Sequence, residues 1–247
     1  MSGVELAIYG VVVFFSTIAG GMAGGGAGFI LTPLLIFMGL TPAESIATGK
    51  AGSLVSVARN IQILSKEKLH SWRFVVPFMV TALVIGLIAP QLIVGIDDEV
   101  YKRAVGVLLL VMIPVMYFKK VGTSKVAVGT HRTAVGAVLL VAAMVLQAVF
   151  SSGLGVLVNI VLIWVFGMGA LEANITKRYS QLVLNVVTVI GLLFTGLIVW
   201  EIAIVNAICA FAGTTIGARL AVKKGNATVM YLFMVIMGIS GVRLLVS

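Results

Sequence analysis

Apolar segments long enough to cross a bilayer follow one another along almost the whole chain, and they leave few choices for its fold. The 247 residues are 61% hydrophobic and 10% charged, whereas a soluble domain carries about 25% charged residues. Several segments approach or exceed the ~18 residues that cross ~30 Å of hydrocarbon. The sequence lacks the short alternating segments of a membrane β-barrel. We therefore expect an all-α polytopic protein embedded in the lipid bilayer.

Ten apolar segments can be distinguished, and the third is unusually polar. Their predicted bounds are Val4–Gly20, Gly28–Met38, Pro42–Leu64, Ser71–Val94, Glu99–Phe118, Arg132–Phe150, Gly153–Phe166, Ala170–Leu197, Trp200–Val222 and Ala227–Leu245. A basic linker separates the fifth segment from the sixth. We predict one membrane domain made of residues 1–118, a cytoplasmic linker at 119–131, and residues 132–247.

The second five segments repeat the first five at a constant offset of 128 positions. A fixed offset over about fifty residues is the signature of an internal duplication. The matching pairs are Gly25 and Gly153, Gly39 and Gly167, Glu44 and Glu172, Thr48 and Thr176, Lys50 and Arg178, and Trp72 and Trp200. Because each unit has an odd number of segments, the units enter the membrane from opposite sides. We expect two inverted-topology repeats with the functional site between them.

The loops that alternate between the two membrane sides differ in their positive charge. The loops of one side carry ten Lys and Arg residues. Those of the other side carry three, which are Lys102, Arg103 and Arg243. Cations accumulate on the cytoplasmic side, so both termini are predicted to be extracytoplasmic, in a bacterial inner membrane. This topology accounts for the net charge of +9, and we expect no nucleic acid as a partner.

A run of glycines between residues 20 and 28 interrupts the first long apolar stretch. As one helix, Val4–Met38 would measure ~52 Å, which is too long for an ordinary crossing. Glycine permits the backbone conformations that a break needs. The spacing of these glycines also fits a helix-packing stripe. We favour a broken hairpin, either re-entrant or fully spanning, with a second such hairpin at Arg132–Phe166.

The tips of the two hairpins are predicted to meet near the midplane and to bind an anion. Free N–H groups and the positive end of the helix dipole at the start of a helix favour negative charge. Broken half-helices in transporters use this arrangement. The tip residues proposed for binding are Gly24, Gly25, Gly26, Gly28, Ser151, Ser152 and Gly153.

Two cations within apolar segments, Lys50 and Arg178, strengthen this prediction. Each lies ~12 Å into its segment, at a depth where a charged side chain is costly and is a functional hypothesis by default. Pairing with a carboxylate or snorkelling is the alternative. Further binding candidates, which could instead hydrogen-bond between helices, are Thr48, Ser53, Ser56, Asn60, Asn159, Thr176, Ser180, Gln181 and Asn185.

Acidic and catalytic signals in the sequence are weak. Thr41, Pro42 and Glu44 fit a helix-capping box with proline at the first helical position, so we interpret Glu44 and the matching Glu172 as caps rather than proton carriers. No nucleophile–base pair, phosphate-binding loop or metal motif is visible. We expect no enzyme activity and no cofactor.

The first glycine run and the residues after it resemble a known family. Gly24-Gly25-Gly26-Ala27-Gly28, then Thr32-Pro33-Leu34-Leu35, Gly39 and Ala47-Thr48-Gly49 are similar to the sulfite exporter TauE/SafE membrane permeases. The resemblance implies a transporter for sulfur-containing anions such as sulfite, sulfoacetate or thiosulfate. Lys50 stands where many members have a small or hydroxyl residue.

Two functional hypotheses follow for this chain. The first is a secondary transporter, an exporter of a small sulfur-containing anion that works by alternating access and is either coupled to protons or driven by the membrane potential. The alternative is an anion channel or uniporter for small anions. Saturation of flux and counterflow distinguish them. The sequence does not fix the oligomeric state.

Overall fold

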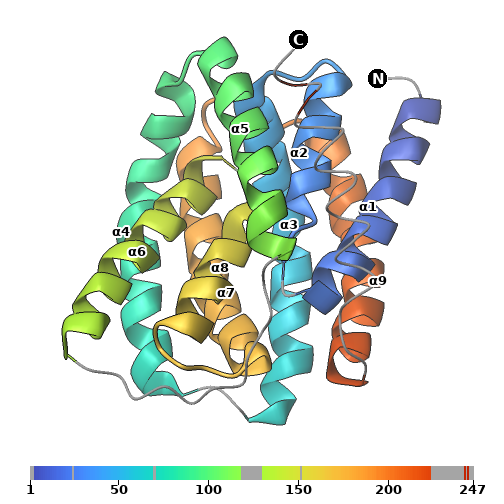
Figure 1. The fold of residues 1–247 in the computed structure, drawn as a ribbon. Coiled ribbons are helices and arrows are strands. Elements are labelled where there is room, and N and C mark those ends of the chain that lie inside the picture. Colours follow the sequence, from blue (N-terminus) through green and yellow to red (C-terminus); the bar gives the residue numbers. More distant parts are fainter. Residues whose placement is uncertain are drawn as a thin grey trace.

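The computed structural model describes residues 3–23, 25–68, 71–117, 130–150 and 152–223, together with positions 242 and 244. Over these residues all of the regular secondary structure is helical (Figure 1). The elements are α1 (Gly3–Ala23), α2 (Gly28–Phe37), α3 (Pro42–Leu64), η1 (Ser65–Glu67), α4 (Trp72–Gly95), α5 (Asp98–Tyr117), α6 (Thr130–Val149), η2 (Ser152–Leu154), α7 (Gly155–Trp164), α8 (Ala170–Leu192) and α9 (Trp200–Lys223). The all-α prediction is confirmed.

Three of the described helices are long and apolar enough to cross a membrane. They cover Gly3–Met22, Trp72–Gly95 and Trp200–Val222. Large apolar side chains point outward from these helices, among them Leu87 on α4 and Ile208 on α9, which are 62% and 66% exposed. An outward-facing apolar surface of this kind is what lipid contact requires. Most of the predicted tenth segment, Ala227–Leu245, and most of the basic linker lie outside the described residues.

The glycine run interrupts the first apolar stretch, as predicted. Helix α1 ends at Ala23 and α2 begins at Gly28. Between them, Gly25 and Gly26 have φ angles of +134° and +108°, which side-chain-bearing residues rarely adopt. Figure 1 shows α2 returning toward the edge from which α1 came, with the turn inside the bundle. We call residues 25–27 the first tip.

The first part of the same glycine run also packs against a neighbouring helix. A Cβ atom added at Gly21 would lie 3.0 Å from the backbone of Gly217 on α9. The helix-packing interpretation therefore holds for the glycine inside α1, and the break interpretation holds for those after Ala23. The two alternatives apply to different parts of the run.

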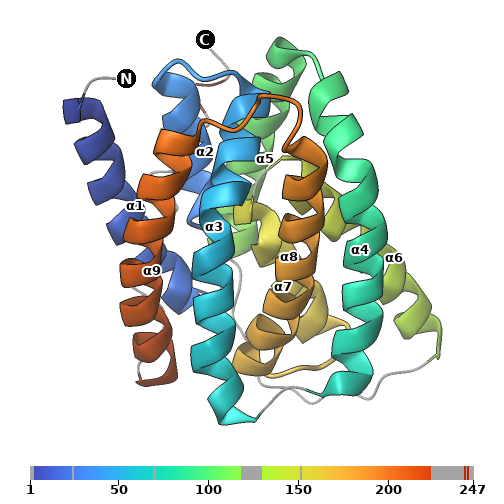
Figure 2. The same cartoon turned by 180° about the vertical axis from the view of Figure 1, so that it is seen from behind.

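Five helices form a row, in the order α1, α9, α3, α8 and α4 (Figure 2). Glycines allow close approach at several of these contacts. A Cβ added at Gly217 of α9 would meet the carbonyl oxygen of Ile18 at 2.2 Å, one at Gly52 of α3 would meet Asn206, and one at Gly191 of α8 would meet Pro90. Such small-residue contacts are typical of membrane helices. The polar helices α3 and α8 thereby lie at the centre of the row.

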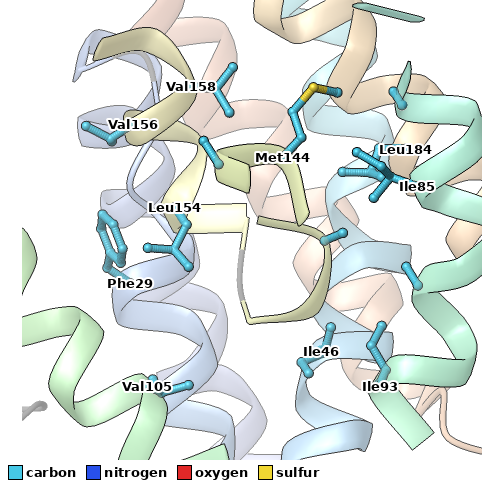
Figure 3. Close-up of a cluster of buried hydrophobic side chains, with 14 of the residues drawn as sticks. Phe29, Ile46, Ile85, Ile93, Val105, Met144, Leu154, Val156, Val158 and Leu184 are labelled. Carbon is cyan, nitrogen blue, oxygen red and sulfur yellow. The ribbon is translucent and has the colours of Figure 1, made fainter. Parts of the chain in front are cut away.

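Helices α2, α5, α6 and α7 form a second layer against one face of this row (Figure 1). The main buried apolar cluster lies between the two layers and includes Phe29, Ile85, Met144, Leu154 and Leu184 (Figure 3). Phe29 opens α2 and Leu154 ends η2, so the cluster reaches both hairpin turns. The Tyr101 hydroxyl donates a hydrogen bond to the carbonyl oxygen of Phe150 and so ties α5 to the second hairpin.

The predicted bounds differ from the structure mainly at the eighth segment. The sequence predicts Ala170–Leu197, but α8 ends at Leu192. The Thr195 hydroxyl donates to the carbonyl oxygen of Leu192 at 2.8 Å, and Gly196 has a φ of +72°. A local side-chain bond and a left-handed glycine therefore end the helix inside apolar sequence.

Candidate anion site

The two central helices begin with caps that fix where their polar residues lie. At the start of α3, the Thr41 hydroxyl accepts a hydrogen bond from the Glu44 N–H at 3.3 Å, and the Glu44 carboxylate accepts from the Thr41 N–H at 2.8 Å. At the start of α8, the Glu172 carboxylate accepts from the Gly169 N–H at 3.3 Å. Both glutamates are therefore engaged as helix caps.

Lys50 and Arg178 lie at matching places on α3 and α8, deep inside the protein. Lys50 is 2% exposed and Arg178 is 8% exposed. The Lys50 ammonium has no hydrogen-bond partner among the described residues, and neither does Nε of Arg178. One guanidinium nitrogen of Arg178 donates to Oε1 of Gln181 at 3.1 Å. Much of the hydrogen-bonding capacity of these two cations is unused.

No carboxylate neutralises these cations. The chain has eight Asp and Glu residues, all eight are within the described ranges, and none of them is buried. Among the described residues, Arg103 forms a salt bridge with Glu99, and both side chains are on the surface of α5. A buried charge without a partner costs several kcal/mol, so an anion from outside the chain would be strongly favoured here.

Both cations line one cavity of about 70 Å³. A single water molecule requires ~10–15 Å³, so the cavity has room for a small oxyanion. Its walls come from α1, the first tip, α2, α3, α8 and α9. The polar and charged residues that line it are Thr17, Thr32, Lys50, Ser53, Ser56, Arg178, Gln181, Asn206 and Thr214.

The first tip forms one wall of this cavity. Gly25, Gly26, Ala27 and Gly28 all line it. Within the described residues, no acceptor is found for the N–H groups of Gly26 and Ala27, and α2 begins directly after them. The positive end of the α2 dipole and these N–H groups therefore border the space that Lys50 and Arg178 share.

The structure brings together about half of the residues that the sequence predicted for the site. Those that line the cavity are Gly25, Gly26, Gly28, Lys50, Ser53, Ser56, Arg178 and Gln181. Those that lie outside its lining are Thr48, Asn60, Gly153, Asn159, Thr176, Ser180 and Asn185. Gly24 and Ser151 are outside the described residues, and the side chain of Ser152 is not described.

Gly153, the described glycine of the second predicted tip, is not part of the cavity lining. A Cβ atom added at Gly153 would lie 2.5 Å from the backbone nitrogen of Phe29 and 2.8 Å from its ring. Gly153 therefore packs against the first turn of α2, which begins directly after the first tip.

Most of the remaining predicted residues are buried outside the cavity lining. The Thr48 hydroxyl accepts a hydrogen bond from the Val199 N–H at 3.0 Å. The Asn185 amide donates to the Ser53 hydroxyl at 3.0 Å and so joins α8 to α3 beside the cavity. Asn60, Asn159 and Thr176 are buried, at 1%, 3% and 1% exposure.

Four polar residues of the cavity wall were not predicted: Thr17, Thr32, Asn206 and Thr214. Asn206 lies in the strongly apolar first half of α9, and a lone amide in a membrane segment could have drawn attention to it. The three threonines carry no such signal. Thr17 donates to the Val13 carbonyl at 2.7 Å, a common way for threonine to satisfy itself within a helix.

A third buried cation, Lys177, points elsewhere. It is 1% exposed, and its ammonium lies near the turns of both hairpins, 2.9 Å from a Cβ added at Gly25 and 3.2 Å from one added at Gly155. Lys177 is therefore behind the first tip rather than in the cavity lining. In the described part of the chain, no cluster of three His, Cys, Asp or Glu side chains could hold a metal ion.

The comparisons with known proteins agree with one another, and each covers nearly the full chain. The sequence profile described as "Sulfite exporter TauE/SafE" matches residues 9–244. A "Probable membrane transporter protein ORF9" from Sinorhizobium is 24% identical, over 97% of this chain and 92% of the relative. A "Probable membrane transporter protein" from Haemophilus influenzae is 22% identical, over 91% of this chain and 88% of the relative. No solved structure matches the chain.

Proposed function

The chain belongs to the sulfite exporter TauE/SafE family of multi-pass membrane transporters, and from this premise we propose that it exports a small sulfur-containing anion such as sulfite, sulfoacetate or thiosulfate. The family is one of transporters rather than enzymes. In this proposal the substrate binds in the cavity between α3 and α8. Lys50, Arg178 and the N–H groups of the first tip hold its oxygen atoms.

One observation carries this proposal: two buried cations share a cavity that no carboxylate enters. Lys50 and Arg178 come from different helices and line the same space, and none of the eight acidic side chains is buried. The uncharged donors around them, such as Ser53 and Gln181, suit the oxygen atoms of an oxyanion. The alternative, that each cation pairs with a carboxylate for structural reasons, lacks a buried carboxylate to serve as the partner.

The proposed inverted repeat is supported by the bounds of the helices. Helix α8 begins and ends 128 positions after α3, and α9 begins and ends 128 positions after α4. The packing is reciprocal as well, since α9 lies along α3 while α4 lies along α8. In Figure 1 the chain runs in opposite directions along α3 and α8. The site would then lie between the two repeats, near the midplane.

The lengths of α2 and α7, the second helix of each hairpin, support turns that lie within the membrane. Helices α2 and α7 have ten residues each, which is ~15 Å and about half of the hydrocarbon thickness. Both hairpin turns are inside the bundle in Figure 1. We propose that α2 and α7 begin at turns near the midplane and return to the side from which α1 and α6, with 21 and 20 residues, enter.

The proposed topology is supported by the edge at which the basic loops lie. The turn at η1, with Lys66 and Lys68, and the end of α9, with Arg219, lie at one edge, and the start of α1 lies at the opposite edge with Lys102 of α5 (Figures 1 and 2). We propose that the first edge is cytoplasmic, in a bacterial inner membrane, and that both termini are outside. The interior-negative membrane potential then drives anions outward.

Transport assays in liposomes test this function. Purified protein in liposomes loaded with unlabelled sulfite should accumulate labelled external sulfite by counterflow, and the flux should saturate. Lys50→Met and Arg178→Met should each lose most of this flux while the protein still folds. A non-saturating flux without counterflow would support the channel alternative, and wild-type flux in both variants would refute the site. An imposed pH gradient separates proton coupling from uniport.

A further inference from the structure

The charges that face the cavity are all of one sign. Lys50 and Arg178 supply two positive charges from α3 and α8, and the other polar side chains in the wall are hydroxyls and amides. The first tip and the start of α2 add further positive electrostatic potential. A bound molecule therefore meets positive charge from three directions.

No wall of the cavity offers a negative charge to a ligand. The acidic residues nearest along the two helices are Glu44 and Glu172, each six positions before the cation on its own helix, or ~9 Å along the axis. Glu44 accepts from the Thr41 N–H and hydroxyl at 2.8 and 2.9 Å, and Glu172 accepts from Gly169. Both carboxylates are used at the helix ends.

A ligand that carries its own ammonium group would bring that charge close to Lys50 and Arg178 in a cavity of only about 70 Å³. Like charges brought together in a site cost enough to exclude the wrong partner. A ligand with two negative charges, in contrast, matches the two cations. The charge of the ligand should therefore decide which sulfur compounds the site accepts.

We propose that the cavity selects compact oxyanions with two negative charges and rejects zwitterions that carry an ammonium group. The inference deepens the proposed function and rests on it, since it concerns the same cavity. Lys50 is the residue that sets the preference for the second negative charge, and Arg178 with the first tip holds the first. Aminosulfonates are excluded although their sulfonate end is the same as that of accepted compounds.

Three two-carbon sulfonates of nearly equal size test this selectivity. Sulfoacetate ends in a carboxylate, isethionate in a hydroxyl and taurine in an ammonium group. Titration calorimetry of the purified full chain should give sulfoacetate at least about 10-fold tighter than isethionate, and taurine at least about 10-fold weaker than isethionate. Taurine binding as tightly as isethionate would overturn the inference, and so would equal binding of sulfoacetate and isethionate.

Two substitutions at position 50 sharpen the test. Lys50→Met should remove most of the advantage of sulfoacetate over isethionate. Lys50→Glu places a carboxylate opposite Arg178 and should raise taurine binding relative to isethionate by about 10-fold. Size-exclusion profiles establish that each variant is folded. A sulfoacetate preference that persists unchanged in folded Lys50→Met would refute the role of Lys50.

A parallel series without sulfur separates this inference from the proposed function. Malonate, 3-hydroxypropionate and β-alanine have the same three end groups on a carboxylate. If sulfite and the sulfonates fail to bind while malonate binds and β-alanine does not, the sulfur-anion function fails and the charge rule stands. If sulfite binds but neither series follows the charge order, the charge rule fails alone. If nothing binds, both fail.

Discussion

Burying the charges of Lys50 and Arg178 lowers the stability of the folded protein. Each is almost fully buried, and neither has a carboxylate nearby. Replacing a buried charge by an apolar side chain of similar size is often stabilising by about 1–4 kcal/mol. Their presence is explained if the charge serves the ligand rather than the fold.

We therefore expect the removal of either charge to affect anion binding and protein stability differently. Lys50→Met should unfold at the same or a higher temperature than the wild type in the absence of anions, and it should lose the stabilisation that saturating sulfite gives the wild type, about 2.7 kcal/mol at 100 times the Kd. Thermal unfolding with and without sulfite measures both. The exposed Lys66→Met is the matched control. Strong destabilisation of anion-free Lys50→Met would indicate a structural charge.

The first tip depends on glycine at two positions in the left-handed region. Gly25→Ala places a Cβ 2.9 Å from the ammonium of Lys177, at a φ of +134°. We expect a loss of about 1–3 kcal/mol of stability and a larger loss of anion binding, because the tip is a wall of the site. Gly95→Ala at the end of α4 meets no atom within 4 Å and should behave as the wild type. Equal effects of the two changes would contradict this account.

At the residue scale, the sequence was informative where a residue conflicted with its surroundings. Lys50 and Arg178 were found because charge in an apolar segment demands an explanation. Thr17 and Thr214 were missed because threonine satisfies itself against its own helix, so nothing marks it as functional. Asn60 and Asn159 have the same chemistry as Asn206, but only Asn206 faces the cavity. The direction of a side chain is set by packing that a single sequence does not reveal.

At the scale of the element, the caps determine whether a glutamate is a proton carrier. Glu44→Gln keeps an amide oxygen that can accept from the Thr41 N–H, so transport should stay within about twofold of the wild type across pH. Thr41→Ala removes the hydroxyl that accepts from the Glu44 N–H and should cost about 1 kcal/mol of stability. A large loss of pH-dependent transport in Glu44→Gln would show that Glu44 carries protons.

The helices themselves were predicted well, since apolar length, glycine breaks and caps are local features. The bounds of α3 were predicted correctly, and α4 and α9 differ from the prediction by a residue at one or both ends. Both hairpin tips are predicted to line the site, but of the second tip's residues Gly153 lies outside the cavity lining. Phe29 packs against Gly153, and this contact between distant segments follows from no periodicity in either hairpin.

At the scale of the molecule, the proposed topology can be tested with single cysteines. The chain has one cysteine, Cys209, so Cys209→Ser gives a background without thiols. A cysteine in place of Glu99, on the surface at the start of α5, should react with a membrane-impermeant thiol reagent added outside intact cells. A cysteine in place of Lys66, in the exposed turn after α3, should react only after the cells are opened. The reverse pattern would invert the topology.

The most direct test of the account is to locate the bound anion. Selenite has the shape and charge of sulfite, and its selenium atom is visible by anomalous diffraction. In crystals grown at a selenite concentration that saturates binding, we expect one buried selenium peak in the cavity, within hydrogen-bond reach of Lys50 and Arg178 and next to the first tip. A peak elsewhere in the bundle, or selenite on the surface alone, would contradict it.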